Sequence, residues 1–238
     1  MNPANNTGQQ TLEVISKADR FNRWIYDTIR PYCHGNILEV GSGIGNISSF
    51  FVQDHFQISL SDVDDYYLQT LKSKYGTSSN VEGILLLDLE HGDFENVYEG
   101  KQNSFDTIFL LNVLEHIKDD NKAVQNCKYL LKNGGTLIIL VPAYSWLYAH
   151  LDKTLAHYRR YSLRNLKRLF SRQQLTVRAH FYFNGIGIIA WSYAKIFRLS
   201  AVPATEMRMY DTLVPFGKLI DKIVLGKIGL SAIIIGDK

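Results

Sequence analysis

Short apolar runs alternate with amphipathic helical patterns along the first 140 residues, and this alternation predicts strands joined by helices. Five strands are expected, at residues 36–40, 57–60, 81–87, 105–111 and 136–141, and the third of them is expected to be buried. Three helices are expected between them. The first begins after residue 46, with Ile47, Phe50 and Phe51 on one face, and the second covers residues 64–75. The third covers residues 119–132, and Asn133-Gly134-Gly135 is expected to end it. The pattern is typical of a parallel α/β sheet.

The pattern changes after residue 142. Ser162 is placed to cap a helix with Leu163, Leu166 and Phe170 inward, and residues 175–183 alternate as a sixth strand, expected to be antiparallel. Residues 184–229 read as a helical insertion, and residues 231–235 as a last strand. The insertion carries an apolar stripe, for which core packing is the expected role, at Phe216, Leu219, Ile220, Ile223 and Val224.

A glycine-rich turn follows the first strand in Leu38-Glu39-Val40-Gly41-Ser42-Gly43-Ile44-Gly45. Such a turn between a strand and a helix offers backbone N–H groups and close approach to a ligand. A dinucleotide fingerprint would place its third glycine at position 46, which is Asn46 here. The carboxylate of Glu39 would repel a diphosphate but suits a ligand with an ammonium group. The turn therefore favours a cationic ligand over NAD(P).

Two further acids follow the next two expected strands. Asp62 comes 21 residues after Gly41, a spacing that suits the two hydroxyls of a ribose, while Asp64 is the alternative N-cap of the following helix. Val63 would then lie against an adenine. Asp88 would accept from the adenine amino group, with Leu89 N–H near the ring, although an aspartate after a strand is commonly a turn residue.

These motifs resemble those of class I S-adenosylmethionine-dependent methyltransferases over residues 36–141. The glycine turn resembles that family's first motif, and Asp62, Asp88-Leu89 and Asn112-Val113-Leu114-Glu115-His116-Ile117 resemble the next three. The resemblance implies a doubly wound, Rossmann-like seven-stranded sheet in the order 3-2-1-4-5-7-6, with strand 7 antiparallel. It also implies cofactor contacts through Gly41, Ser42, Gly43, Gly45, Asn112 and Val113. More loosely, His157-Tyr158-Arg159-Arg160-Tyr161 resembles a subgroup with an H-x-R-R-Y segment.

We therefore expect one methyltransferase domain over residues 1–238. Its parts are an N-terminal helical cap (1–35), a cofactor-binding core (36–141), an acceptor-side loop, helix and strand (142–183), the helical insertion (184–229) and the last strand (230–238). In the cap, Trp24 and Tyr26 belong to a helix that in many relatives lies over the cofactor, and simple packing is the alternative, favoured for Trp24.

Methyl transfer from a sulfonium needs alignment more than a fixed catalytic triad, and a base only where the acceptor keeps its proton. His116 and His157 are the candidate bases, with orientation of the loop as the alternative role for His116. Tyr144, Arg159, Arg160 and Tyr161 are the candidate acceptor-binding residues, since paired guanidiniums bind carboxylates and phosphates well. One of the two arginines could instead bind carbonyl groups of a neighbouring turn.

Composition narrows the remaining choices. A net charge of +3 gives no argument for nucleic-acid binding, and the spacing of the two cysteines, Cys33 and Cys127, predicts neither a disulfide framework nor a metal site. The polar first twelve residues predict no secretory signal, so a cytoplasmic protein is expected, as monomer or homodimer. The preferred acceptor is a small molecule, with a lipid- or sugar-linked acceptor and membrane contact as less favoured options. The alternatives are an NAD(P)-dependent oxidoreductase and a catalytically silent cofactor-binding protein.

Overall fold

The computed structural model describes residues 3–238, and their side chains from residue 8 onward. Seven strands form one sheet in the order β3-β2-β1-β4-β5-β7-β6, which confirms the expected order. The strands are β1 (Ile37–Val40), β2 (Ile58–Asp62), β3 (Val81–Leu86), β4 (Phe105–Leu111), β5 (Leu131–Pro142), β6 (Thr176–Phe183) and β7 (Ser231–Asp237). The first five are parallel, whereas β7 is antiparallel to both of its neighbours. The reversed strand is therefore β7, and the expectation that the sixth strand is reversed was wrong.

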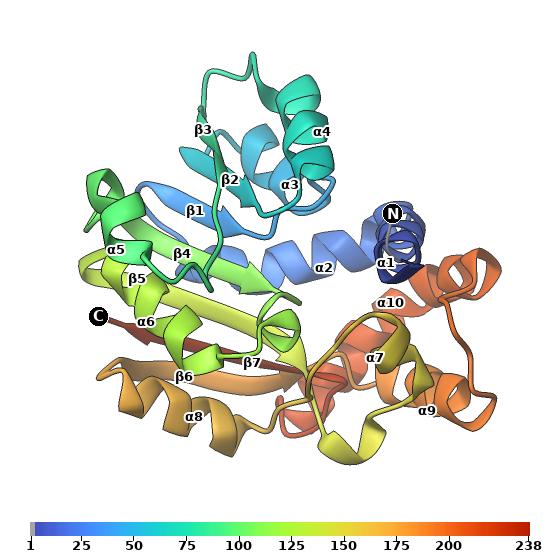
Figure 1. The fold of residues 1–238 in the computed structure, drawn as a ribbon. Helices are drawn as coiled ribbons and strands as arrows, with labels where there is room; N and C mark the ends of the chain where they lie inside the picture. Colours follow the sequence, from blue (N-terminus) through green and yellow to red (C-terminus); the bar gives the residue numbers. More distant parts are fainter. Residues whose placement is uncertain (1–2) are drawn as a thin grey trace.

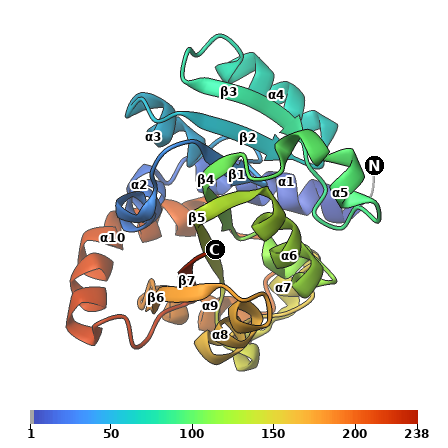
Figure 2. The same cartoon turned by 90° about the vertical axis from the view of Figure 1, so that its left-hand side faces the viewer.

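Helices cover both faces of the sheet (Figures 1 and 2). They are α1 (Pro3–Ser16), α2 (Asp19–Ile29), α3 (Ser48–Gln53), α4 (Asp65–Tyr75), α5 (Phe94–Val97), α6 (Asp120–Leu130), α7 (His150–Thr154), α8 (Leu163–Arg172), α9 (Gly187–Ile196) and α10 (Ala204–Val224). One core lies between the sheet and α5, α6 and α8, and includes Phe94, Val124 and Phe170. The other lies under α2 and α3 and includes Tyr26 and Phe51.

Capping residues fix several helix starts as the sequence predicted. The Asp64 side chain accepts a hydrogen bond from Tyr66 N at the start of α4, and Ser162 accepts one from Asn165 N at the start of α8. Asp119 does the same for Lys122 N at the start of α6. Each bond satisfies an N–H group that the first helical turn leaves without a partner.

The expected end of α6 was wrong. The helix ends at Leu130, and Leu131 already pairs with Phe105 in β4, whereas the next β4 pair joins Thr107 to Thr136. Residues 132–135 therefore bulge out of the β4–β5 ladder instead of ending a helix. Gly134 has φ +77° there. The Leu131 side chain is buried in the sheet, so β5 begins at a residue that the helical periodicity assigned to the preceding helix.

Two other expectations about burial also fail. β3 was expected to be buried, but it lies at the edge of the sheet and is only partly covered, with Leu86 57% exposed. The apolar stripe of the insertion was expected to pack into the core, yet Phe216, Leu219, Ile220 and Ile223 are exposed to solvent. Within residues 3–238 no helix has the length and apolarity needed to cross a membrane.

α2 was the helix expected to lie over the cofactor, but it packs in the core. Trp24 and Tyr26 on α2 are buried in the core, with exposed fractions of 6% and 0%. α1, which also lies within the expected helical cap, is the helix that contacts the glycine turn. A Cβ atom built on Gly43 would lie 3.3 Å from Cδ1 of Leu12 on α1, and Gln9 donates a hydrogen bond to Tyr66 OH on α4.

Candidate functional site

The carboxyl ends of the parallel strands form one edge of the sheet, which faces α1, α7 and α9 (Figure 1). Three non-glycine residues with left-handed backbone follow the ends of β4, β5 and β6 at this edge. They are Asn112 (φ 55°), Tyr144 (φ 62°) and Asn184 (φ 69°). Such conformations cost free energy and concentrate at functional sites, because the surrounding structure must hold them in place.

The glycine turn between β1 and α3 takes the conformation that the sequence predicted. Gly41, Gly43 and Gly45 all have positive φ, at 71°, 54° and 80°. A Cβ atom on Gly41 would lie 2.5 Å from Cγ2 of Val113, so the turn and the loop after β4 are in direct contact. Glycines at these positions therefore let the turn pack closely against Val113, Leu12 and Tyr75.

Asp62, at the end of β2, holds this turn in place. Its Oδ2 accepts a hydrogen bond from Gly43 N at 2.9 Å, and its Oδ1 accepts from Val63 N and Asp64 N at 2.8 and 3.1 Å. Burial raises the pKa of this carboxyl, while the three N–H groups act in the opposite direction. A carboxylate has about four lone-pair positions, so Oδ2 keeps room for one more donor such as a ribose hydroxyl.

Glu39 lies below the turn with its side chain buried. Its Oε2 accepts a hydrogen bond from the Ser48 hydroxyl at the start of α3. Burial raises the pKa of Glu39 to about 7, although hydrogen bonds from Ser48 and Ser42 lower it. The carboxyl thus ties β1 to α3, and its binding of a ligand ammonium stays a prediction.

The remaining expected cofactor residues lie after β2, β3 and β4. Val63 is 62% exposed, as a residue that meets a flat ring needs to be. Asp88 forms a turn, since its Oδ1 accepts from Glu90 N at 2.8 Å, and the Leu89 side chain is buried in the core. Asn112 N donates to Leu140 O at 2.8 Å, which fixes the start of the loop that carries Val113.

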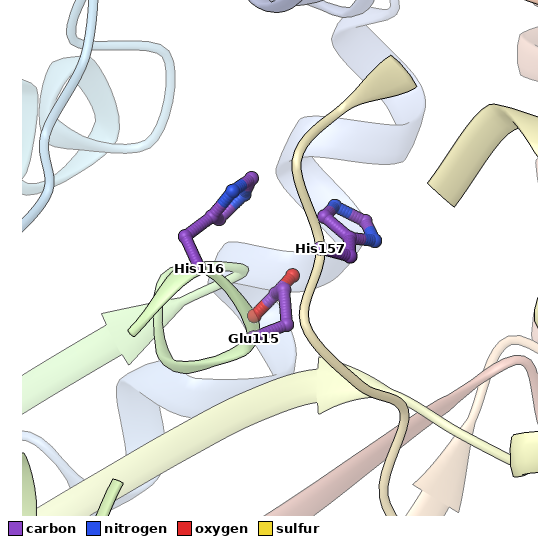
Figure 3. A group of neighbouring side chains, drawn as sticks. All are labelled: Glu115, His116 and His157. Carbon is purple, nitrogen blue, oxygen red and sulfur yellow. The ribbon is translucent and has the colours of Figure 1, made fainter. Parts of the chain in front are cut away.

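His116 and His157 come together in this loop region, although 40 residues separate them along the chain (Figure 3). Their rings meet edge to face with centroids 4.7 Å apart. Tyr158 N donates to Glu115 O at 2.8 Å, so a backbone bond joins the two segments. The sequence predicted both histidines as candidates but gave no reason to expect their contact.

The two histidines have different surroundings. His157 is 9% exposed, and its Nδ1 lies 2.9 Å from Oδ1 of the buried Asp152, which leaves Nε2 as the acceptor nitrogen. His116 is exposed to solvent, yet the neighbouring protein partly desolvates its ring, which lowers its pKa. A His116 ring nitrogen hydrogen-bonds to the backbone of Ala156. His116 is therefore neutral at pH 7 and keeps one nitrogen able to accept a proton.

Glu115 lies beside the two histidines and is the unexplained group of this cluster (Figure 3). Its side chain is fully buried, and neither Oε1 nor Oε2 has a hydrogen-bond partner among the described residues. Burial raises its pKa to about 8, and the charge of Arg160 only partly offsets this. One ligand atom from each of Glu115, His116 and His157 lies within 4.8 Å of the others, close enough to be bridged by a metal ion. The expectation of no metal stays a prediction.

The guanidiniums of Arg159 and Arg160 bind partners within the protein, Arg160 in the interior and Arg159 at a partly exposed position. Arg160 is buried; its Nε donates to Asp152 Oδ1 at 2.8 Å, one of its terminal nitrogens donates to Ala143 O at 3.0 Å, and its guanidinium lies 4.4 Å from the ring centroid of Trp191. Arg159 pairs with Asp120 at 3.0 Å and donates to Lys118 O. Both guanidiniums bind carbonyl groups and carboxylates of the protein itself, so the structure does not support their expected role in anion binding.

Tyr144 and Tyr161, the two tyrosines expected to bind the acceptor, differ in burial. Tyr161 is buried in the core, and its hydroxyl bonds to Leu114 O and Asp120 Oδ2 at 3.3 and 3.2 Å, so it has no free face for an acceptor. Tyr144 stacks on Tyr182 with ring centroids 4.8 Å apart and neighbours the exposed Trp146. Tyr144 remains the predicted acceptor residue that this geometry leaves at the sheet edge.

Comparison with known proteins finds methyltransferase domains in sequence and methyltransferase folds in structure. Residues 38–139 match the family model described as "Methyltransferase domain". The chain is 27% identical to probable polyketide synthase 42 of Dictyostelium discoideum over 143 residues, which are 52% of this chain and 5% of that protein. The chain thus spans about one twentieth of the length of the curated relatives it matches.

Solved structures share the fold. A SAM-dependent methyltransferase from Archaeoglobus fulgidus aligns with a TM-score of 0.58 and 15% identity, covering 91% of this chain and 94% of that one. Phosphoethanolamine N-methyltransferase 2 of Haemonchus contortus, solved with S-adenosyl-L-methionine, aligns with a TM-score of 0.61 and 18% identity, covering 91% of this chain and 52% of that one.

Proposed function

We propose that this chain, whose residues 38–139 match the methyltransferase-domain model, is a class I, S-adenosylmethionine-dependent methyltransferase. It would methylate a small-molecule or lipid- or sugar-linked acceptor by in-line displacement, with His116 as the general base. The observation that carries the base assignment is the contact of His116 with the buried His157–Asp152 pair, in the loop that follows Asn112 and Val113.

The glycine turn and Asp62 are the groups that would hold the cofactor. The three glycines of the turn have positive φ, which residues with side chains rarely adopt, and the remaining lone pair of Asp62 suits a ribose hydroxyl. The sulfonium methyl of the cofactor is already activated, so the protein needs to align the acceptor and to exclude water. Val113, which packs against Gly41, and the neighbouring Asn112 would contribute to this alignment.

His116 is placed to take the acceptor proton. Its bond to the Ala156 backbone fixes the ring, and its lowered pKa keeps it neutral at pH 7. Behind it, Asp152 fixes His157, and the His157 ring packs against that of His116. His157 is therefore a positioning residue in this proposal: it fixes the direction in which the base faces.

Two measurements test the proposal. Calorimetric titration should show binding of S-adenosylmethionine, whereas binding of NADH without it would favour an oxidoreductase. Formation of S-adenosylhomocysteine should then be followed with a panel of phenol, amine, carboxylate and polyprenyl-phosphate acceptors. With an accepted substrate, His116→Gln should lower the turnover by about 10²–10⁴-fold while leaving cofactor affinity unchanged. Equal turnover in His116→Gln would refute the base assignment, and no product with any acceptor would favour a silent binding protein.

A further inference from the structure

The outward face of α10 is apolar, although it faces water. The exposed side chains of this face follow one another at spacings of three and four residues, so they share one stripe along the helix. They are Met209 (62% exposed), Leu213 (43%), Phe216 (64%), Leu219 (56%), Ile220 (38%) and Ile223 (70%). Contiguous exposed apolar surface of this kind marks an interaction site.

The other face of α10 fixes this orientation. Asp221 accepts hydrogen bonds from Asn184 N and Gly185 N at 2.6 and 2.7 Å, and Asp211 accepts from Phe21 N at 2.9 Å. A Cβ atom on Gly217 would lie 2.8 Å from Ile186, so the helix packs closely at that point. Turning the stripe inward would break these contacts, and the apolar face is therefore held toward solvent.

The apolar surface continues beyond the helix. Leu225 and Ile228, just after α10, are 75% and 51% exposed, and α9 presents Ile189 and Ile196, each 75% exposed. α9 and α10 lie at the end of the molecule toward which the arrowheads of β4 and β5 point (Figure 1). This is the side of the sheet that also carries the glycine turn and His116.

The charges around the stripe indicate whether it binds a second copy of the chain or a lipid surface. Between residues 187 and 228 the exposed charged side chains are one acid, Glu206, and five cations: Lys195, Arg198, Arg208, Lys222 and Lys227. A second copy of the chain would bring these cations against each other with a single acid to offset them. A surface of anionic lipid headgroups would instead attract them, while the apolar tips enter the acyl boundary.

We propose that α10, together with α9, docks this protein on an anionic lipid surface and turns the cofactor edge of the sheet toward acceptors held in the membrane. The stripe occupies one face of the helix, which suits a helix lying in the plane of the interface. The docking stands apart from the chemistry at His116, so each can fail without the other.

Co-sedimentation tests the docking, with vesicles of phosphatidylcholine and with vesicles of an equal mixture with phosphatidylglycerol. The full chain should bind the anionic vesicles, and added salt should weaken binding. The double variant Phe216→Ser/Ile223→Ser should lower the partition coefficient by roughly tenfold or more. Arg208→Glu/Lys222→Glu should lower it on anionic vesicles only. The control Leu86→Ser/Val97→Ser removes equally exposed apolar side chains from β3 and α5 and should change nothing.

Sedimentation velocity without vesicles tests the alternative that a second copy of the chain covers the stripe, because it measures the oligomeric state. A dimer that Phe216→Ser/Ile223→Ser dissociates, together with no vesicle binding by the unmodified chain, would overturn the proposal in favour of a second copy. Binding that both double variants on α10 leave intact would overturn it as well. Calorimetric titration with S-adenosylmethionine should give equal affinity for every variant, which confirms folding and separates lipid docking from cofactor binding.

Discussion

His157 and Arg160 share one acceptor atom, Oδ1 of Asp152, at 2.9 and 2.8 Å. Arg160 also donates to Ala143 O, just after β5, so the ring of His157 is tied to the end of a central strand through two side chains. Burial raises the pKa of Asp152, but the His157 hydrogen bond and the Arg160 charge outweigh it and the net pKa is lowered. The segment that carries His157 is thus positioned by an ion pair inside the protein.

Loss of that ion pair should destabilise the fold. Arg160→Ala leaves the buried Asp152 with hydrogen bonds to His157 and Ala149 N but without its guanidinium, and removing one member of a buried pair typically costs about 3–5 kcal/mol. Urea denaturation measures the free energy of unfolding. Arg159→Ala is the matched control, since its pair with Asp120 is partly exposed and should contribute about 0–1 kcal/mol. Equal effects of the two substitutions would contradict the structural role of Arg160.

His157→Gln should separate turnover from cofactor binding. Loss of the partner that positions His116 should lower kcat by about 10–100-fold, as with other residues that orient a functional side chain. The affinity for S-adenosylmethionine should stay the same, because the His157 side chain contacts Asp152 and His116, whereas the cofactor is expected at the glycine turn. His180→Gln, on exposed β6, is the control. An unchanged kcat would remove His157 from the proposal.

Glu115 should make the protein less stable in alkaline solution. Its pKa is raised from 4.5 to about 8, so the folded state favours the protonated carboxyl. The associated stability is fully present below pH 4.5 and is lost as the pH rises through about 8. Glu39, raised to about 7, acts in the same direction. Arg160, Asp152, His116 and His157 are the charged or titratable groups beside Glu115.

Glu115→Gln tests this pH dependence. The variant should gain about 1–3 kcal/mol relative to the unmodified protein between pH 5 and about pH 9, the usual cost of a buried polar group without a partner. Urea denaturation across this range gives both curves. Parallel curves would mean that Glu115 finds a partner, such as a bound cation, and metal analysis of the purified protein would then identify it.

Asp62→Ala should weaken binding of S-adenosylmethionine by about 1–3 kcal/mol, because the variant loses a buried acceptor for the ribose and the anchor of Gly43 N. Calorimetric titration measures the affinity. Asp64→Ala is the control: it removes the N-cap of α4 and should cost about 1 kcal/mol of stability without changing affinity. If Asp64→Ala weakens binding as much as Asp62→Ala, the ribose is misplaced.

The sequence predicted the sheet well because its signals are local. The strand over residues 105–111 has the expected bounds, and Asp64 and Ser162 cap their helices as expected, since apolar runs and caps depend on neighbouring residues. The end of α6 depends instead on how Leu131 pairs with Phe105. A pairing between strands leaves no periodic signal, so helical spacing was extended by two residues.

In the candidate site, too, local sequence signals were predictive and contacts made only by the fold were not. The glycine turn and Asp62 were expected to lie together because their spacing is characteristic, and Gly43 N does bond to Asp62. The partners of Arg160 were not, since Asp152, Ala143 and Trp191 meet it only through the fold. Glu115 was noticed only within its motif, and its lack of partners is a property of packing. An exposed apolar stripe on α10 has the same periodicity as a buried one, so sequence alone assigned it to the core.

β7 enters the sheet between two strands that precede it in the chain. β5 is complete by residue 142 and β6 by residue 183, yet neither can pair on its inner side until residues 231–237 have been made. A growing chain therefore carries two open strand edges while the ribosome adds the intervening helices: that of β5, rich in Ile and Leu, and that of β6, which ends in Phe181, Tyr182 and Phe183. Open edges of this kind invite pairing with other chains, so newly made protein should depend on chaperones more than the finished fold does.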